Sequence, residues 1–391
     1  MTEATAADYA WFNDHWLRQH FCITLIRERD EAEVLRRFGG EHSQPRRLTV
    51  AQVSELSKPL PARYLQLVVV ARRGGWTVAV EDNGFEGWRP EVLRALSHGT
   101  QVVSVFHNGI EGYFSHAVDG EVLVQFELLF PHRRWGSQPH LLLAQMRAVG
   151  LDPDWDEPPP GKLVTGALAL AERVTGIHLD PDVLEGPLLV AEIAPLLDDP
   201  PASFSLEGED AELTEAVNQA TSGGLRRAAA TVARQAVQLA RLEQDPVVLE
   251  ALATAEADQV RPVDDHSPLG WRIRSWIREV RIAERVRSDP PASPEAQQRE
   301  ASQHRAVGQT VERPLFDPSP WLGPGWTGLV LRWRTGQAVR AALFANPRTA
   351  FYATLEQLRY LPGDPWMAIR AAALAVLRSG RAASPPDAVD R

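Results

Sequence analysis

The sequence changes character at the segment DPDWDEPPPGK, residues 152–162. Before it, runs rich in β-branched and aromatic residues alternate with glycine-containing turns, a pattern typical of strands and hairpins. After it, apolar residues recur at helical spacing and no run resembles a strand. A stiff, polar, proline-rich segment between two such regions is typical of a linker. For a chain of 391 residues we therefore expect an α+β domain over 8–152, a linker over 153–162, a helical domain over 163–380 and a disordered tail over 381–391.

The region before the linker predicts a mainly antiparallel sheet of about six strands with flanking helices. Gly74-Gly75 and Asp119-Gly120 fit short hairpin loops, and hairpins favour an α+β fold over a doubly wound parallel sheet. The predicted strands are 20–26, 64–71, 76–81, 101–107, 113–118 and 121–127, and the predicted helices are 8–18, 31–38, 50–56, 92–96 and 139–149.

The region after the linker predicts helices only. Asp245-Pro246, Asn346-Pro347 and Asp364-Pro365 each fit an N-cap followed by proline in the first turn. The last helix resembles the second helix of a HEAT-type repeat, but no period of about 40 residues is found, so we expect an irregular helical domain. The predicted helices are 163–174, 182–197, 225–242, 245–257, 271–287, 327–344, 347–361 and 365–379.

The composition argues against a membrane protein and against a protein that coats nucleic acid. No window approaches the ~20 apolar residues of a membrane helix, and the acidic N-terminus does not resemble a signal peptide, so we expect a cytoplasmic protein with no membrane partner. A net charge of -10 argues against a surface that coats nucleic acid. Cys22, the lone cysteine, lies in the apolar run FCITLI and is expected to be a buried structural thiol.

The most enzyme-like residues are Glu81, Asp82, His98, His107 and His116, since acids and imidazoles near a sheet edge can act as bases or bind a metal. The three histidines are nine residues apart on separate elements, which is not the spacing of a metal motif. No nucleotide loop or GxSxG elbow is present either. We therefore assign no catalytic residue, no metal ligand and no cofactor.

Two features indicate binding to another protein. The stretch GGWTVAVEDNGFEGW predicts a strand, a turn at Asp82-Asn83-Gly84, and a tight loop that presents Glu81, Asp82, Glu86 and Trp88 near a sheet end. The helix over 271–287 carries a cationic stripe beside an apolar one; the alternative is a solvated face whose charge Glu279 and Glu284 partly offset. The stripe consists of Arg274, Arg278, Arg281 and Arg285.

Tryptophan is abundant, with 12 residues. Trp76, Trp276 and Trp333 share faces with aliphatic residues and are expected to pack in cores. A second group lies beside charges near the ends of elements, where an aromatic ring can anchor a partner. This group is Trp11, Trp16, Trp88 and Trp135.

The N-terminal half resembles a known family. The segments WFNDHW, FCITLI, EVLRRFGG, GGWTVAVEDNGFEGW, LSHGTQVVSVFHN, HAVDGEVLVQFE and MRAVGLDP, in that order, are similar to an actinobacterial domain family of unknown function over about residues 8–155. The resemblance implies no activity, cofactor or catalytic residue.

These observations favour a non-catalytic, cytoplasmic interaction or regulatory protein, of an immunity or antitoxin type, that binds another protein. One alternative is a hydrolase or metal-dependent enzyme that uses Asp82 with His98 or His107. The other is a nucleic-acid-linked regulator that uses the arginine stripe over 274–285. The sequence leaves the oligomeric state open.

Overall fold

The computed structural model describes residues 3–40, 43–49, 52–53, 65–154, 163–288, 325–359, 361 and 365–379. Over these described residues, the chain divides into two compact units, the first ending at Leu196 and the second beginning at Leu197. The first is α+β and the second is built from helices, as the sequence predicts. The helix expected over 50–56 lies almost entirely outside the described residues, as do most of the expected linker and the whole tail over 381–391.

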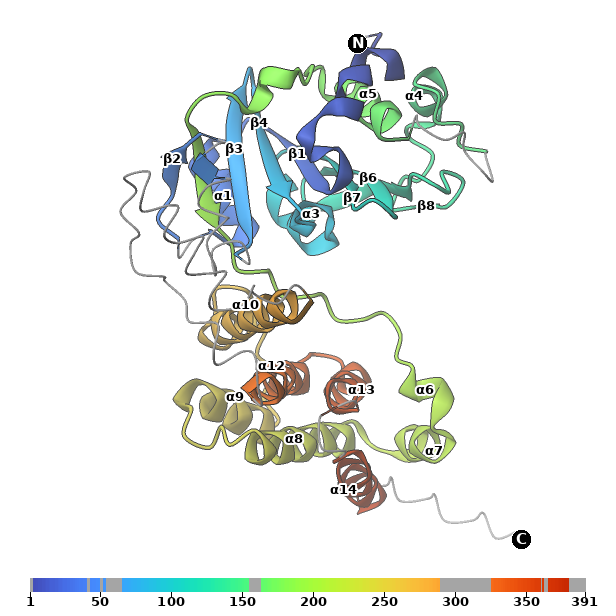
Figure 1. Ribbon diagram of the computed structural model, residues 1–391. Coiled ribbons are helices and arrows are strands. Elements are labelled where there is room, and N and C mark those ends of the chain that lie inside the picture. The colour runs from blue at the N-terminus through green and yellow to red at the C-terminus, as the bar shows by residue number, and fades with distance from the viewer. Residues whose placement is uncertain are drawn as a thin grey trace, which may run out of the picture. The chain divides into compact units, whose positions relative to one another are not determined.

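Within the described residues, the first unit holds one nine-stranded sheet in the order β2-β9-β3-β4-β1-β5-β6-β7-β8, with antiparallel neighbours throughout (Figure 1). The strands are β1 (Phe21–Arg27), β2 (Arg46–Leu48), β3 (Leu67–Arg73), β4 (Trp76–Asp82), β5 (Gln101–His107), β6 (Gly112–Val118), β7 (Glu121–Glu127), β8 (Arg134–Trp135) and β9 (Leu188–Glu192). All six predicted strands are confirmed, and β2, β8 and β9 are additional.

The turns form where the sequence places them. The β3–β4 hairpin turns at Gly74, with φ of 56°, and the β6–β7 hairpin turns at Asp119 and Gly120, with φ of 47° and 80°. Two consecutive residues with positive φ match the right-handed twist of the strands that they join. These hairpins fix the register, so residues on neighbouring strands can be assigned to one face of the sheet.

Both faces of the sheet are covered. Phe21, Ile23 and Leu25 of β1 pack on one face against the 3₁₀ helix η1 (Ala6–Asp14) and the helices α4 (Leu143–Ala148) and α5 (Leu163–Thr175). On the other face, Ile26 packs among residues of α1 (Glu31–Leu35), the π-helical turn η3 (Arg36–Gly40) and α3 (Pro90–Ser97). Because both faces are covered, β1 and β4 are buried at every position except their last.

The boundary of the first unit differs from the prediction. α5 buries its apolar face in the core beneath the sheet, and the segment predicted as a helix over 182–197 instead forms the short 3₁₀ helix η6 (Pro181–Leu184) and then β9. β9 pairs with both β2 and β3, so it is an internal strand. The first unit therefore continues to Leu196 and includes α5, η6 and β9.

The second unit packs its helices around α8, whose alanine-rich faces are buried. Asp245 and Asn346 cap α9 and α13 through their side chains, as predicted, whereas Asp364 lies outside the described residues. The described helices are α6 (Leu206–Glu209), α7 (Ala211–Gln219), α8 (Ser222–Leu239), α9 (Pro246–Glu256), α10 (Pro268–Ser288), α12 (Gly325–Ala342), α13 (Pro347–Leu358) and α14 (Trp366–Ser379). No helix in the described part of the chain has both the length and the apolar character required to cross a membrane.

Candidate functional site

The turn after β4 folds back over its own sheet and is held there by Glu81. One carboxylate oxygen, Oε2, accepts a hydrogen bond from the Glu86 backbone N–H at 3.0 Å, and Oε1 accepts one from Gly87 at 2.8 Å. These two amides begin the 3₁₀ turn η5 (Glu86–Trp88). Asn83 supplies the reversal with φ of 55°, and Gly84 allows the close return, since a Cβ there would lie 2.6 Å from the Glu81 side chain. The carboxylate thus fixes η5 on the sheet.

Glu81 and Glu86 are fully enclosed. Burial, and then the nearby charge of Glu86, raise the pKa of Glu81 to about 7, although the two backbone donors oppose that rise. Glu86 accepts a hydrogen bond from Arg89 Nη1 at 2.6 Å, and Arg89 Nη2 donates to the carbonyl of Leu196 at 3.0 Å. The acidic pair is therefore stabilised by one buried guanidinium and by backbone amides, a pattern that buried charges require.

A small polar cluster lies beneath Gly87. Thr24 Oγ1 and Ser104 Oγ are 3.1 Å apart, and Cys22 Sγ is 3.4 Å from Ser104 Oγ. Burial and the neighbouring Glu81 raise the pKa of the Cys22 thiol well above its ordinary value. A thiol that is held protonated is a poor nucleophile, so this geometry suits Cys22 to a structural role.

Trp88 at the end of η5 covers a set of aromatic rings. Its ring stacks on Tyr113 with centroids 4.5 Å apart and on Phe106 at 5.6 Å. Trp135 on β8 meets the edge of Tyr113 at 6.1 Å. We call Trp88, Tyr113 and Trp135 the aromatic patch; Trp135 is 42% exposed, whereas Phe106 below it is buried.

One glutamine sets the geometry of the aromatic patch. The Gln125 amide donates to the carbonyl of Trp88 at 3.1 Å and to Ser115 Oγ at 3.0 Å, and its oxygen accepts from Trp135 Nε1 at 2.8 Å. Because Gln125 is itself buried, both tryptophans are tied to the sheet through it. The aromatic patch is therefore pre-organised, which lowers the entropy lost when such residues bind a partner.

Two carboxylates border the aromatic patch. Burial raises the pKa of the Tyr113 hydroxyl, and the charges of Glu111 and Glu127 raise it further. Glu127 is the register partner of Tyr113 on the adjacent strand, so the two side chains share a face. Glu111 lies in the β5–β6 loop, where the Asn108 side chain accepts hydrogen bonds from the backbone of Ile110 and Glu111.

The structure corrects part of the predicted binding loop. Glu81 and Glu86 are 1% and 0% exposed, so neither can contact a partner directly. Their charges are satisfied inside the fold by backbone amides and Arg89. Asp82 is exposed and Trp88 is half-buried, so of the four predicted residues only these two remain accessible.

The five enzyme-like residues do not form one cluster. Asp82 and His107 both pair with Phe21 from opposite sides, so β1 separates them. Two strand spacings place their backbones roughly 10 Å apart. His98 precedes β5 at the far end of the sheet, and His116 is buried with its pKa lowered to about 4 by that burial. Among the described residues, no group of three or more His, Cys, Asp or Glu side chains could hold a metal ion.

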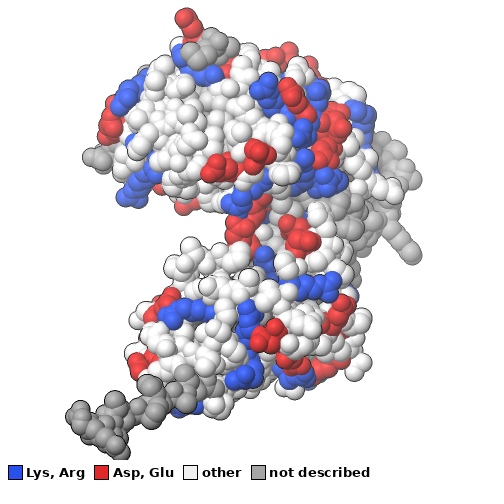
Figure 2. Space-filling model, turned by 180° about the vertical axis from the view of Figure 1, so that it is seen from behind, with Lys and Arg blue, Asp and Glu red and all other residues white. Residues whose placement is uncertain are grey.

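The arginine stripe on α10 is only partly accessible. Arg274 is 0% exposed, donates from Nη1 to the carbonyl of Asp265 at 3.1 Å and lies 5.1 Å from the centroid of the Trp271 ring. This corrects its assignment as a contact residue, whereas Arg278, Arg281 and Arg285 are half-buried. On the face drawn in Figure 2, acidic and basic side chains are interspersed over both units, which is not the single-sign field that nucleic-acid binding favours.

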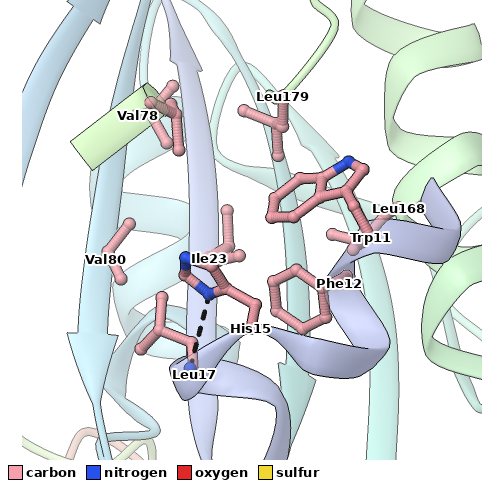
Figure 3. Close-up of a pocket in the computed structure, with 10 residues that line it drawn as sticks. Trp11, Phe12, His15, Leu17, Ile23, Val78, Val80, Leu168 and Leu179 are labelled. Atoms are coloured by element: carbon pink, nitrogen blue, oxygen red, sulfur yellow. Dashed lines mark hydrogen bonds between the residues drawn. The ribbon is translucent and has the colours of Figure 1, made fainter. Parts of the chain in front are cut away.

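An apolar cavity lies between the N-terminal segment and the sheet. Figure 3 shows Trp11, Phe12, His15 and Leu17 facing Ile23, Val78 and Val80 of β1 and β4. Its volume is about 10 Å³, which is about the space of a single water molecule. The cavity is therefore a packing gap rather than a substrate pocket.

The sequence identified only part of the aromatic patch. Trp88 and Trp135 were expected to anchor a partner, but Tyr113, Gln125 and the two bordering glutamates were missed. Their signal was the alternation of side chains along β6 and β7, which puts Tyr113 with Ser115 and Gln125 with Glu127 on one face. This alternation identifies the residues that share a face only once the pairing of β6 with β7 is known.

Comparison with known proteins gives a family match for the first unit but no activity. Residues 2–195 match the model of a Family of unknown function (DUF6461). This confirms the expected resemblance to a domain family of unknown function and extends it from about residue 155 to residue 195. No curated protein and no solved structure gives a significant match.

Proposed function

We propose that the unit matched by this family of unknown function is a non-catalytic interaction module that binds another protein through the aromatic patch. The observation that supports the proposal is the partly exposed Trp135, held by the buried Gln125 against Tyr113, on which Trp88 also stacks. Rigid aromatic side chains with a polar tether are the residues that most often dominate protein–protein binding energy. A cytoplasmic role of a regulatory or immunity type is consistent with this proposal, since it requires occupancy of a partner surface and no reaction.

The arrangement of the other candidates makes catalysis and nucleic-acid binding weaker proposals. Strand β1 lies between Asp82 and His107, His98 lies at the other end of the sheet, and Glu81 is committed to backbone amides. In the arginine stripe, the first guanidinium is buried. The aromatic patch, in contrast, combines exposure, rigidity and charge at one location.

The test compares two exposed apolar residues of the first unit. Trp135 and Leu141 are 42% and 44% exposed, so Trp135→Ala and Leu141→Ala remove side chains of comparable accessibility. A photo-crosslinking residue at the 81% exposed position of Ile110, in the loop that carries Glu111, is introduced into the full chain and into its Trp135→Ala and Leu141→Ala variants. Each protein is expressed in the organism that encodes it, and its crosslinked products are analysed by quantitative mass spectrometry. We expect a stoichiometric crosslinked partner that is lost in Trp135→Ala but kept in Leu141→Ala. Retention of the same partner by Trp135→Ala, with folding verified by circular dichroism, would refute the proposal.

A further inference from the structure

The aromatic patch presents a ring surface, and its two acidic neighbours present negative charge beside it. Trp135 pairs with Gln125, and Glu127 lies two residues further along the same face of β7. Diagonal neighbours of this kind are roughly 7–8 Å apart, within reach of one long side chain. An extended side chain that lies on the exposed ring of Trp135 can therefore also reach the Glu127 carboxylate.

The two carboxylates are not neutralised by nearby residues of the protein. Neither Glu111 nor Glu127 forms an ion pair with any residue that the structure describes. The nearest cations in sequence are engaged elsewhere: the Arg133 guanidinium lies 4.7 Å from the Phe130 ring centroid, and Arg134 donates to the carbonyls of Pro131 and Pro153. The aromatic patch is therefore bordered by negative charge that an external cation would complement.

The loop that carries Glu111 is ordered by its own hydrogen bonds. Asn108 N donates to the Glu111 carbonyl at 3.0 Å, and the Asn108 side chain accepts from the Glu111 N–H at 2.7 Å. Gly109 has φ of 85°, which allows this tight turn. The negative charge of Glu111 is therefore held in place before any cation binds at Glu127, so binding requires little reorganisation of this loop.

We infer that the aromatic patch recognises an arginine side chain of the partner protein, with the guanidinium over Trp135 and hydrogen-bonded to Glu127, and with Glu111 adding electrostatic attraction. This inference rests on the proposed function and specifies what the partner presents. Arginine fits better than lysine, because its planar guanidinium can stack on an aromatic ring and donate in parallel to a carboxylate.

The probe is the tripeptide Ac-Gly-Arg-Gly-NH2, with citrulline and lysine counterparts, added to the full chain labelled with 5-fluorotryptophan. Trp135→Phe assigns the fluorine resonance of Trp135. We expect the arginine peptide to shift this resonance in a saturable, salt-sensitive manner and to bind roughly tenfold more tightly than the citrulline peptide, with lysine in between. Equal affinities for arginine and citrulline would overturn the inference.

Charge variants provide the matched comparison. Glu127→Gln is expected to weaken arginine binding about fivefold, whereas Glu121→Gln, an exposed carboxylate at the other end of the same strand, is expected to leave it unchanged. Equal effects of both variants would also overturn the inference. If capture of a partner requires Trp135 but the arginine and citrulline peptides bind alike, the aromatic patch remains the binding surface and only the inference of arginine recognition fails. If the arginine peptide binds at Trp135 but the Trp135→Ala protein still binds its partner, only the proposed function fails.

Discussion

Replacing Glu81 by glutamine tests whether this carboxylate is buried as the geometry describes. In the folded protein its pKa is about 7, compared with 4.5 for an ordinary glutamate. Between these two pH values the folded state binds more protons than the unfolded state, so the free energy of unfolding falls as pH rises from about 4.5 to about 7. A pKa difference of this size corresponds to about 3 kcal/mol, present in full at acidic pH and lost above neutrality.

Glu81→Gln removes this titration but disturbs the hydrogen bonds of η5. Glu81 uses separate oxygens for the N–H groups of Glu86 and Gly87, and in the protonated acid the hydroxyl oxygen can still accept, whereas a carboxamide offers one oxygen and one NH2 group that only donates. One buried amide is then left facing a donor, which costs about 1–3 kcal/mol. We therefore expect the variant to be less stable than the natural protein at pH 5, with the difference shrinking or reversing by pH 8.5.

The assay is urea denaturation of the full chain at several pH values, followed by hydrogen-exchange mass spectrometry of peptides from β1 and β4 so that the transition is assigned to the first unit. Glu121→Gln, which changes an exposed carboxylate of the same sheet, is the control and should keep the pH dependence of the natural protein. An equal fall in stability with pH in the natural protein and in Glu81→Gln would refute the burial argument.

Gly87→Ala should destabilise the first unit by about 1–3 kcal/mol in thermal denaturation, because the new Cβ would lie 2.2 Å from Thr24 Oγ1. Gly75→Ala is the control and should have little effect, since a Cβ at that position would have no atom within 4 Å. Equal losses of stability in the two variants would contradict this reasoning. Because burial lowers the folded-state pKa of His116 to about 4, its imidazole should remain neutral down to about pH 5 in a side-chain NMR titration. Its contribution to the free energy of unfolding should be lost as pH falls below about 6.5, where the unfolded chain takes up a proton. A titration of His116 near pH 6.5 in the folded protein would disprove its burial. Asn346→Ala should cost about 0.5–2 kcal/mol by removing the cap that accepts from Arg348 and Thr349, measured by denaturation, and an unchanged stability would show that the cap is dispensable.

Local signals in the sequence were sufficient for most of the first unit. The strands at 20–26 and 76–81 and the turn at Asp119-Gly120 are encoded by neighbouring residues, and the structure has them within one or two positions. β9 was missed because LLVAE is short, contains a single β-branched residue and continues into further apolar residues, so it resembles a helix. Its conformation is determined by pairing with β2 and β3, about 120–140 residues earlier in the chain.

In the candidate site too, some features follow from neighbouring residues in the sequence and others depend on contacts between distant parts of the chain. The exposed position of Trp135 and the turn at Asn83 follow local rules, but the burial of Glu81 and Glu86 does not. A charged stretch beside an Asn-Gly turn is normally solvated; here η5 folds onto the sheet, and its backbone amides and Arg89 replace water. Sequence spacing alone does not reveal such a fold-back, because it depends on space above Thr24 and Cys22 that only the paired strands define.

The insertion of β9 between β2 and β3 has a consequence for biosynthesis. A chain emerging from the ribosome exposes β3 without one of its neighbours until residues near Leu196 are released, and β2 has no partner before then. An unsatisfied strand edge is a site for mispairing with other nascent chains. Translation through the proline-rich residues 152–162 falls within the interval in which this edge is open, so slow elongation there would lengthen the time during which the edge can mispair.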